Sequence, residues 1–205
     1  MDDHAPRAAQ PRKPHDFNAF YAATPPWDIG HPQPAFQRLA DGGQIRGRVL
    51  DVGCGTGEHA LMAARLGLEA VGVDTAPAAI AIAQRKARER ALGARFATAN
   101  ALDLAQLGEQ FDTVLDCGLF HVLDDADRRA FVDSLAAAVR PGGRYFMLCF
   151  SDRQSGDQGP RRITEAEIRS SFASGWRVDS IQPAHLEITS GPPPILAWLA
   201  SLTRL

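Results

Sequence analysis

The residues best suited to chemistry lie in one short segment of the chain, VLDVGCGTGEH from Val49 to His59. Gly53, Gly55 and Gly57 let the backbone turn tightly and approach a ligand without obstruction from a Cβ atom. Asp51 precedes these glycines inside a hydrophobic stretch, where a carboxylate is costly unless it is paired. We therefore expect Asp51 to have a partner, such as loop amides or a ligand ammonium group.

The glycine spacing separates two classes of cofactor. The motif is G-x-G-x-G, whereas the dinucleotide fingerprint G-x-G-x-x-G requires glycine where Glu58 stands. A carboxylate near a helix N-terminus is unfavourable for a pyrophosphate, so a nicotinamide-dependent oxidoreductase is the weaker alternative. Asp74 follows a second hydrophobic stretch and suits the hydroxyls of a ribose; its alternative role, capping the next helix, is also open to Thr75. The pattern favours a nucleoside without phosphate, preferably a cation.

Regular alternation of short hydrophobic runs and helical patterns begins after Gly43. It predicts strands at 48–52, 69–74, 94–97, 111–116 and 144–150, and helices at 35–41, 58–66, 77–92 and 125–139. Farther on, 164–172 is helical by pattern, 176–188 is strand-like, and the spacing in 195–205 fits either a helix or an edge strand. Such alternation is typical of an α/β domain with a mostly parallel sheet covered on both faces.

The chain divides into a tail and one domain. Residues 1–15 lack hydrophobic periodicity and are expected to be a disordered tail, and residues 16–205 form a single domain. The segment 17–43 is rich in aromatic residues and prolines and precedes the first strand, so we interpret it as a lid. The polar, glycine-containing loop 151–164 follows a strand, at the edge of the sheet where ligands bind in such folds.

Composition excludes several function classes. The formal charge of −2, without a basic run, argues against nucleic acid as a partner, and the apolar runs are too short to span a membrane. The chain contains three cysteines but no CxxC pair, so we expect neither a disulfide framework nor a metal site. With no apolar leader, we expect a cytoplasmic protein. Without a basic run or an appended domain in this sequence, we expect it to act on a small molecule, as a monomer or weak homodimer.

Taken together, these motifs resemble those of the class I S-adenosylmethionine-dependent methyltransferases. The resemblance covers about residues 45–150 and rests on five segments in the expected order: Asp51–Gly57, Asp74, Asn100–Asp103, Phe111–Asp116 and Arg140–Gly143. It implies a Rossmann-like, doubly wound, seven-stranded sheet, mostly parallel with an antiparallel C-terminal strand at 197–202. It also implies S-adenosyl-L-methionine as cofactor and S-adenosyl-L-homocysteine as product.

The resemblance also assigns cofactor contacts. Gly53 to Gly57 would line the methionine moiety, Asp74 would bind the ribose, and Ala101 and Leu102 would flank the adenine. The full expected set is Trp27, Asp51, Gly53, Cys54, Gly55, Gly57, Asp74, Thr75, Asn100, Ala101, Leu102, Asp116 and Cys117.

The flanking segments are most similar to the thiopurine, thiol/halide and tellurite-resistance methyltransferases. Thr24–Pro34 is similar to their N-terminal segment that closes over the cofactor, which makes Trp27 the expected lid aromatic. Cys117–His121 is similar to their segment after the fourth strand, and Gly159–Arg162 to their substrate loop. Arg161 and Arg162 depart from that pattern, because thiol and halide members have apolar or aromatic residues there.

The acceptor site has two interpretations at each key residue. His121 is either the general base, and thus the catalytic residue, or a hydrogen-bonded wall residue. Arg161 and Arg162 either bind an anionic or carbonyl-bearing substrate or form a solvated pair. The expected substrate-binding set is Phe20, Tyr21, Trp27, Phe120, His121, Arg161 and Arg162. The expected reaction is methyl transfer to S, N or O of a thiol, phenol or heteroaromatic molecule; the alternative is a non-catalytic S-adenosylmethionine-binding protein that acts through a partner.

Overall fold

A seven-stranded sheet forms the centre of the computed structural model, which describes residues 17–189 and 193–205. Its strand order is β3-β2-β1-β4-β5-β7-β6. The strands are β1 (Val49–Val52), β2 (Ala70–Asp74), β3 (Arg95–Thr98), β4 (Phe111–Cys117), β5 (Val139–Phe150), β6 (Trp176–Leu186) and β7 (Ile195–Arg204). Only β7 runs against its neighbours, pairing antiparallel with both β5 and β6. This confirms the predicted fold class and resolves the ambiguous C-terminal segment as a strand.

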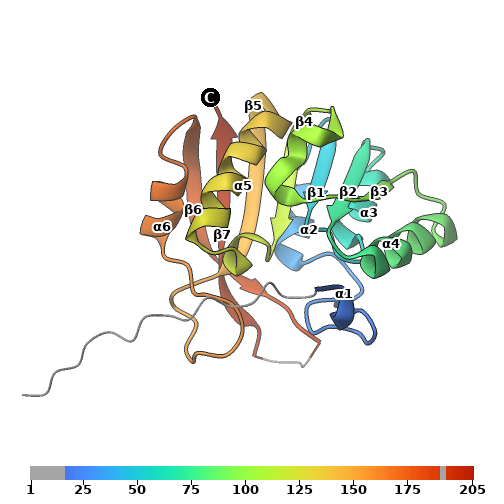
Figure 1. Ribbon diagram of the computed structural model, residues 1–205, viewed down its shortest axis with the longest axis horizontal. Helices are drawn as coiled ribbons and strands as arrows, with labels where there is room; N and C mark the ends of the chain where they lie inside the picture. Colours follow the sequence, from blue (N-terminus) through green and yellow to red (C-terminus); the bar gives the residue numbers. More distant parts are fainter. Residues whose placement is uncertain (1–16, 190–192) are drawn as a thin grey trace, which may run out of the picture.

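Helices cover both faces of the sheet (Figure 1). Helices α2 (Pro34–Asp41), α3 (Glu58–Arg65) and α4 (Pro77–Glu89) pack on one face. The 3₁₀ segments η1 (Ala101–Leu107) and η2 (Phe120–Val122), with α5 (Asp125–Ala138) and α6 (Glu165–Ser171), pack on the other. Side chains along β5 alternate between these two cores, as a strand buried on both faces requires, with Tyr145 and Met147 on one side and Phe146 and Leu148 on the other.

Two boundaries differ from the sequence-based expectation by three residues or more. Helix α4 ends at Glu89 instead of 92, because Ala91 adopts a left-handed conformation with φ of 50° before Gly93 is reached. The Arg140–Gly143 turn does not separate α5 from β5; it lies within β5 as an irregularity where the register with β4 shifts. The predicted disordered tail, residues 1–15, lies outside the described residues.

One end of the sheet brings distant segments together. The parallel strands finish at the lower end in Figure 1, where α1 (Phe17–Phe20), the loop after β5 and the facing ends of β6 and β7 also lie. The strand order reverses between β1 and β4, which is where open α/β sheets bind ligands. Within the described residues, no helix is long and apolar enough to cross a membrane.

Candidate active site

A cavity of about 590 Å³ lies at this end of the sheet. Its walls include the glycine loop, the ends of β2 and β4, the lid, the loop after β5 and the facing ends of β6 and β7. The sequence-predicted residues that line it are Tyr21, Trp27, Gly53, Cys54, Gly55, Asp74, Thr75, Ala101, Cys117 and His121. A second hollow, of about 620 Å³ between α4 and β3, contains none of the predicted site residues.

Asp74 holds the glycine loop in place. Its Oδ2 accepts a hydrogen bond from the backbone N of Gly55 at 2.9 Å, and its Oδ1 accepts one from the backbone N of Ala76 at 2.9 Å. Gly55 has a φ of 51°, and an added Cβ would lie 2.8 Å from the hydroxyl of Tyr21, so the loop needs glycine here for both conformation and space. Thr75 does not cap α4, whose N-cap is Ala76 without a side-chain hydrogen bond.

Asp51 lies beneath this loop and keeps one oxygen without a partner. Its Oδ2 accepts from the backbone N of Ala60 at 3.0 Å, whereas Oδ1 has no hydrogen bond within the described part of the chain. His59 Nδ1 lies 3.9 Å from that oxygen. Burial, together with the nearby Asp74 and Asp116 carboxylates, raises the pKa of Asp51 to about 7. Asp51 therefore has a backbone partner at one oxygen only, and that partner is an amide of the first turn of α3 and not of the glycine loop.

Glu58 does not present a free carboxylate to a ligand. Its oxygens accept hydrogen bonds from Lys86 Nζ at 2.9 Å and from the Arg90 guanidinium at 2.8 and 2.9 Å. These two cations on α4 lower the pKa of Glu58 against the opposing effect of burial. The argument that Glu58 would repel a pyrophosphate is therefore weaker than its position in the sequence implied, and the missing glycine remains the stronger argument against a dinucleotide.

The lid is fastened to both halves of the domain. Asp28 Oδ1 accepts a hydrogen bond from Thr56 of the glycine loop at 2.7 Å, and the backbone N of Thr189 donates to the carbonyl of Pro26 at 2.8 Å. Gln33, 2% exposed, pairs with the backbone of Glu187 through both atoms of its amide, each at 2.9 Å. The lid segment therefore closes the cavity as a bound element of the fold.

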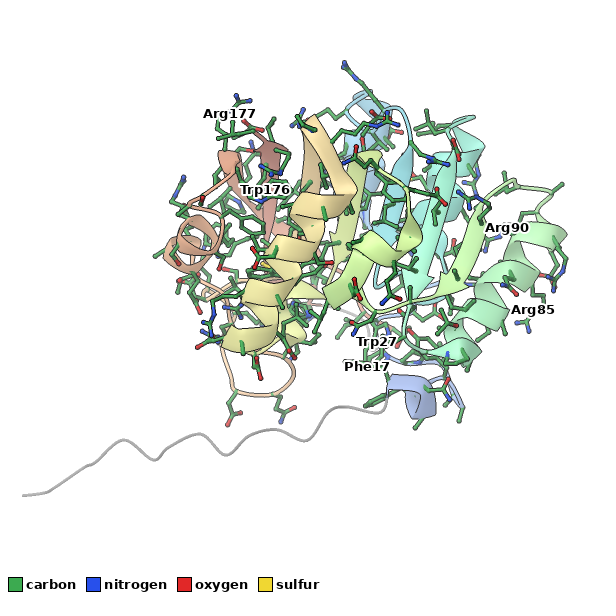
Figure 2. All side chains as sticks on the ribbon, turned by 45° about the horizontal axis from the view of Figure 1, so that its top comes forward. Phe17, Trp27, Arg85, Arg90, Trp176 and Arg177 are labelled. Atoms are coloured by element: carbon green, nitrogen blue, oxygen red, sulfur yellow. The ribbon has the colours of Figure 1, made fainter. Side chains whose placement is uncertain are left out.

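Aromatic residues of the lid gather beside α1, where Phe17 and Trp27 lie close together in Figure 2. The indole Nε1 of Trp27 donates to the hydroxyl of Tyr21 at 3.2 Å, and both rings line the cavity. Phe20 packs on Trp27 with ring centroids 5.2 Å apart, but it is 44% exposed and lies outside the cavity lining. Trp27 and Tyr21 are thus placed to contact a ligand, and Phe20 supports Trp27 from outside.

His121 lines the cavity together with Gly118 and Phe150. Its Nδ1 accepts a hydrogen bond from the backbone N of Phe150 at 3.0 Å, and its ring packs edge-to-face on the Phe150 ring. Burial, together with the positive charges of Arg162 and Arg128, lowers the pKa of His121 to about 3. The imidazole is therefore neutral near pH 7.

The two arginines predicted for substrate binding point elsewhere. Arg161 pairs with Asp125 and Glu167 on the outer surface. Arg162 donates to backbone carbonyls of its own loop, including Gln154 and Pro160, and its guanidinium carbon lies 5.2 Å from the ring centroid of Phe150. Neither arginine lines the cavity; residues 158–160 of the same loop do.

Several other predicted contacts lie behind the cavity wall. Phe120 is fully buried and packs on Phe172, and Asp116 accepts hydrogen bonds from Tyr145 and two backbone amides. The residues of the predicted set outside the cavity lining are Phe20, Asp51, Gly57, Asn100, Leu102, Asp116, Phe120, Arg161 and Arg162.

Comparison with known proteins decides the family. Residues 49–143 match the family described as a methyltransferase domain. The chain is 38% identical over 168 residues to the 2-heptyl-1-hydroxyquinolin-4(1H)-one methyltransferase of Mycobacteroides abscessus. The aligned residues cover 80% of this chain and 74% of the relative. The chain belongs to the class I S-adenosylmethionine-dependent methyltransferases.

Solved structures agree with this assignment. The methyltransferase superposes on a solved structure that concerns the conversion of a disulfide bond into a thioacetal group during echinomycin biosynthesis. The TM-score is 0.84 and the sequence identity 39%, and the superposition covers 92% of this chain and 91% of the other. It also superposes on magnesium protoporphyrin IX methyltransferase from Synechocystis with bound S-adenosylhomocysteine, at TM-score 0.66 and 23% identity, covering 83% and 80%. The latter likeness shows the shared fold.

The cofactor of the family is S-adenosylmethionine, and the site of this methyltransferase fits it. The cavity volume lies within the range of small-ligand sites. Asp74 places a carboxylate in the cavity wall at the end of β2. Val73, Ala99 and Ala101 provide an apolar wall suited to an aromatic base.

Sequence reasoning missed part of the methyltransferase site. Gln33 and His59 line the cavity, and the backbone N of Gln33 donates to His59 Nε2 at 3.1 Å. Further apolar lining comes from Leu186 at the end of β6, Ile188 just after that strand and Ile195 at the start of β7. The one signal in the sequence was a glutamine within a proline-rich segment. Nothing in the sequence pattern predicted that β6 and β7 would lie next to the lid. Within the described ranges, no cluster of His, Cys, Asp or Glu is arranged to hold a metal ion.

Proposed function

We propose that this methyltransferase transfers the methyl group of S-adenosylmethionine to an S, N or O atom of a small aromatic or heteroaromatic molecule. One observation carries the proposal: a single cavity joins the glycine-loop wall to an apolar wall beneath a fastened lid. This arrangement supports the proposal, because an acceptor bound in the same cavity as the cofactor would lie next to it and away from water.

The apolar wall favours a flat, hydrophobic acceptor. It is formed by Pro26, Ile29, Leu119, Val122, Phe150, Pro160, Leu186, Ile188 and Ile195. Such a surface gains free energy by removing apolar area of the ligand from water. The relative from Mycobacteroides abscessus, which is named for a heptyl hydroxyquinolone, supports this class of acceptor.

Positioning is the main task of this chain. The bound cofactor supplies an activated methyl group on a sulfonium. Asp74 and the Gly53–Gly57 loop hold and orient it, and Trp27 with the rest of the lid excludes water. Alignment of two reactants supplies about 7 to 11 kcal/mol, whereas a general base supplies about 3 to 5 kcal/mol. We therefore assign most of the rate enhancement to the cavity walls.

Calorimetric titration with S-adenosylhomocysteine, followed by methylation assays read by mass spectrometry, tests the proposal. The acceptor panel contains 2-heptyl-1-hydroxyquinolin-4(1H)-one, a substituted phenol, a thiophenol and an N–H heteroaromatic compound. We expect cofactor-product binding and a mass gain of one methyl group on at least one acceptor. Binding without methylation of any acceptor would favour the non-catalytic alternative, and no binding would contradict the proposal. The narrower resemblance to the thiopurine, thiol/halide and tellurite-resistance group stays a prediction that the thiophenol tests.

A further inference from the structure

The hydrogen bond between Phe150 and His121 decides which ring nitrogen of the histidine carries the proton. The backbone N of Phe150 lies 3.0 Å from Nδ1 and donates to it, so Nδ1 must hold a lone pair. A neutral imidazole then carries its hydrogen on Nε2. Phe150 is the last residue of strand β5, and it lies 29 positions from His121 in the sequence.

The Nε2 edge of the same ring is open toward the cavity. Nε2 has no hydrogen-bond partner among residues 17–189 and 193–205, and both His121 and Gly118 line the cavity. A Cβ atom at Gly118 would lie 3.3 Å from Nε2 and 3.3 Å from Cε1, so the glycine leaves this edge uncovered. An N–H group that faces a largely apolar cavity needs an acceptor once a ligand displaces water from it.

The surroundings of the ring oppose its protonation. Arg162 comes from the loop after β5 and Arg128 from α5, and both lower the pKa of His121 together with burial. Phe150 packs against the ring edge-to-face. Accepting a substrate proton at Nε2 would require that nitrogen to lose its hydrogen to Nδ1, which would place an N–H against the N–H of Phe150.

We propose that His121 donates a hydrogen bond from Nε2–H to an oxygen of the methyl acceptor instead of taking a proton from it. The acceptor class is then an apolar, flat molecule with an oxygen that has a free lone pair, either a carbonyl or an ionised hydroxyl. This inference rests on the proposed methyl-transfer function. It makes His121 a substrate-binding residue and leaves ionisation of the acceptor to the acceptor's own acidity.

The tautomer is tested directly by ¹⁵N NMR of the wild-type protein labelled at histidine, from about pH 5 to about pH 8. We expect the His121 signals of an Nε2–H ring that stays neutral over this whole range. An Nδ1–H ring, or titration within the range, would overturn the proposal. This measurement needs no substrate and no variant, so a folding defect cannot obscure its result.

Kinetics with a matched pair of acceptors test the contact. The pair is 2-heptyl-1-hydroxyquinolin-4(1H)-one and its analogue 2-heptyl-1-hydroxyindole, which keeps the N-hydroxyl group and has no oxo oxygen. Both are assayed with wild-type protein, His121→Leu, His121→Gln and the control His185→Leu, whose histidine is exposed on β6. We expect His121→Leu to raise KM for the oxo compound by about tenfold to a hundredfold and to change KM for the analogue less than threefold. His121→Gln keeps an N–H donor and should recover part of the loss.

The pH profile separates hydrogen-bond donation from general-base catalysis. If His121 donates, the pH dependence of kcat follows the pKa of the acceptor and keeps its position in His121→Leu. If His121 is a base, kcat falls for both acceptors and an ionisation disappears from the profile, which would overturn the inference. If His121 instead bonds the ionised 1-hydroxyl oxygen, His121→Leu raises KM equally for both acceptors and leaves the pH profile unchanged. That result supports hydrogen-bond donation to the oxyanion and excludes donation to the carbonyl oxygen.

Failure of the proposed function gives a different result. In that case the wild-type protein binds no S-adenosylhomocysteine or methylates neither acceptor, whereas failure of this inference leaves both activities intact. We expect the dissociation constant of S-adenosylhomocysteine for His121→Leu to stay within about twofold of the wild type, because the proposed contact of His121 is with the methyl acceptor.

Discussion

The two sides of the cavity are built in different ways. The proposed cofactor side consists of strand ends and the Gly53–Gly57 loop, which lie close in sequence. Asp74 accepts a hydrogen bond from the Gly55 amide of the loop, and Asp51 accepts one from the Ala60 amide of α3. The acceptor side joins the lid, the loop after β5 and the facing ends of β6 and β7, which are far apart in sequence. The first depends on local backbone geometry, and the second depends on a few long-range contacts. The acceptor side can therefore vary while the cofactor side stays intact.

The largest expected effect is a loss of stability in Gly57→Ala, which changes the glycine loop on the cofactor side of the cavity. Gly57 has a φ of 86°, and an added Cβ would lie 2.6 Å from the Phe96 ring and 2.9 Å from the Cβ of Ala83. Left-handed strain and overpacking together predict a loss of about 2 to 5 kcal/mol in the free energy of unfolding. Urea unfolding measures it. The control Gly67→Ala has a φ of 78° with nothing within 4 Å, so it should lose only about 1 to 2 kcal/mol.

Asp74→Asn should weaken cofactor binding more than it weakens the fold. The substitution removes a charged acceptor at the end of β2, where Oδ2 holds the Gly55 amide. We expect the dissociation constant of S-adenosylhomocysteine to rise about tenfold to a hundredfold by calorimetry. Asp103→Asn, at an exposed carboxylate of η1, is the matched control and should leave the constant unchanged. Equal effects of the two substitutions would contradict a direct role for Asp74.

Gln33→Ala tests whether the acceptor side depends on its long-range contacts. The variant loses both hydrogen bonds to the backbone of Glu187 and should cost about 1 to 3 kcal/mol in unfolding free energy. We expect KM for the acceptor to rise several-fold more than the dissociation constant of S-adenosylhomocysteine. Gln37→Ala, in the helix α2 that Gln33 precedes, removes a side-chain hydrogen bond to Asp41 only and serves as control. A larger effect on cofactor binding than on the acceptor would break the distinction between the two sides.

The contributions of Asp51 and His121 to the free energy of unfolding should change with pH in opposite directions. The pKa of Asp51 is raised to about 7, so its contribution to stability is complete below about pH 4 and is lost as pH rises through about 7. The pKa of His121 is lowered to about 3, so its contribution is complete above about pH 6.5 and is lost as pH falls toward 3.

Urea unfolding of ligand-free Asp51→Asn and His121→Leu across this range measures the two contributions. The stability of the wild type relative to Asp51→Asn should fall with rising pH, and relative to His121→Leu it should rise, each by at most about 1.4 kcal/mol per pH unit. Slopes of the same sign would show that one of the two groups has the opposite pKa shift.

Arg161→Ala should have the smallest effect. Arg161 pairs with Asp125 and Glu167 at the surface, and such pairs contribute less than about 1 kcal/mol. We expect an unfolding free energy within that margin of the wild type and an unchanged KM for the acceptor. Arg162→Ala should cost more, because its guanidinium donates to backbone carbonyls of its own loop. A large rise in KM for Arg161→Ala would restore the substrate-binding interpretation.

Much of the fold and half of the site were predictable from local pattern. The alternation of hydrophobic runs and helices predicted the sheet, and the glycine spacing with Asp74 predicted the cofactor side. Prediction was weaker at Arg161 and Arg162, because an arginine side chain is long enough to reach partners that the sequence does not name. It was also weaker at Asp116, where a carboxylate at a strand end holds Tyr145 and backbone amides and does not line the cavity.

By itself, the sequence determined the class of fold, the glycine loop and the carboxylate at the end of β2, because these depend on residues within one or two adjacent elements. Only the tertiary structure decided which tautomer His121 adopts and how the lid is fastened. Both depend on contacts across the chain: His121 on the amide of Phe150, and Gln33 on the backbone of Glu187, which is 154 positions away. The geometry of such contacts exists only once the sheet has brought β5, β6 and the lid to one end of the molecule.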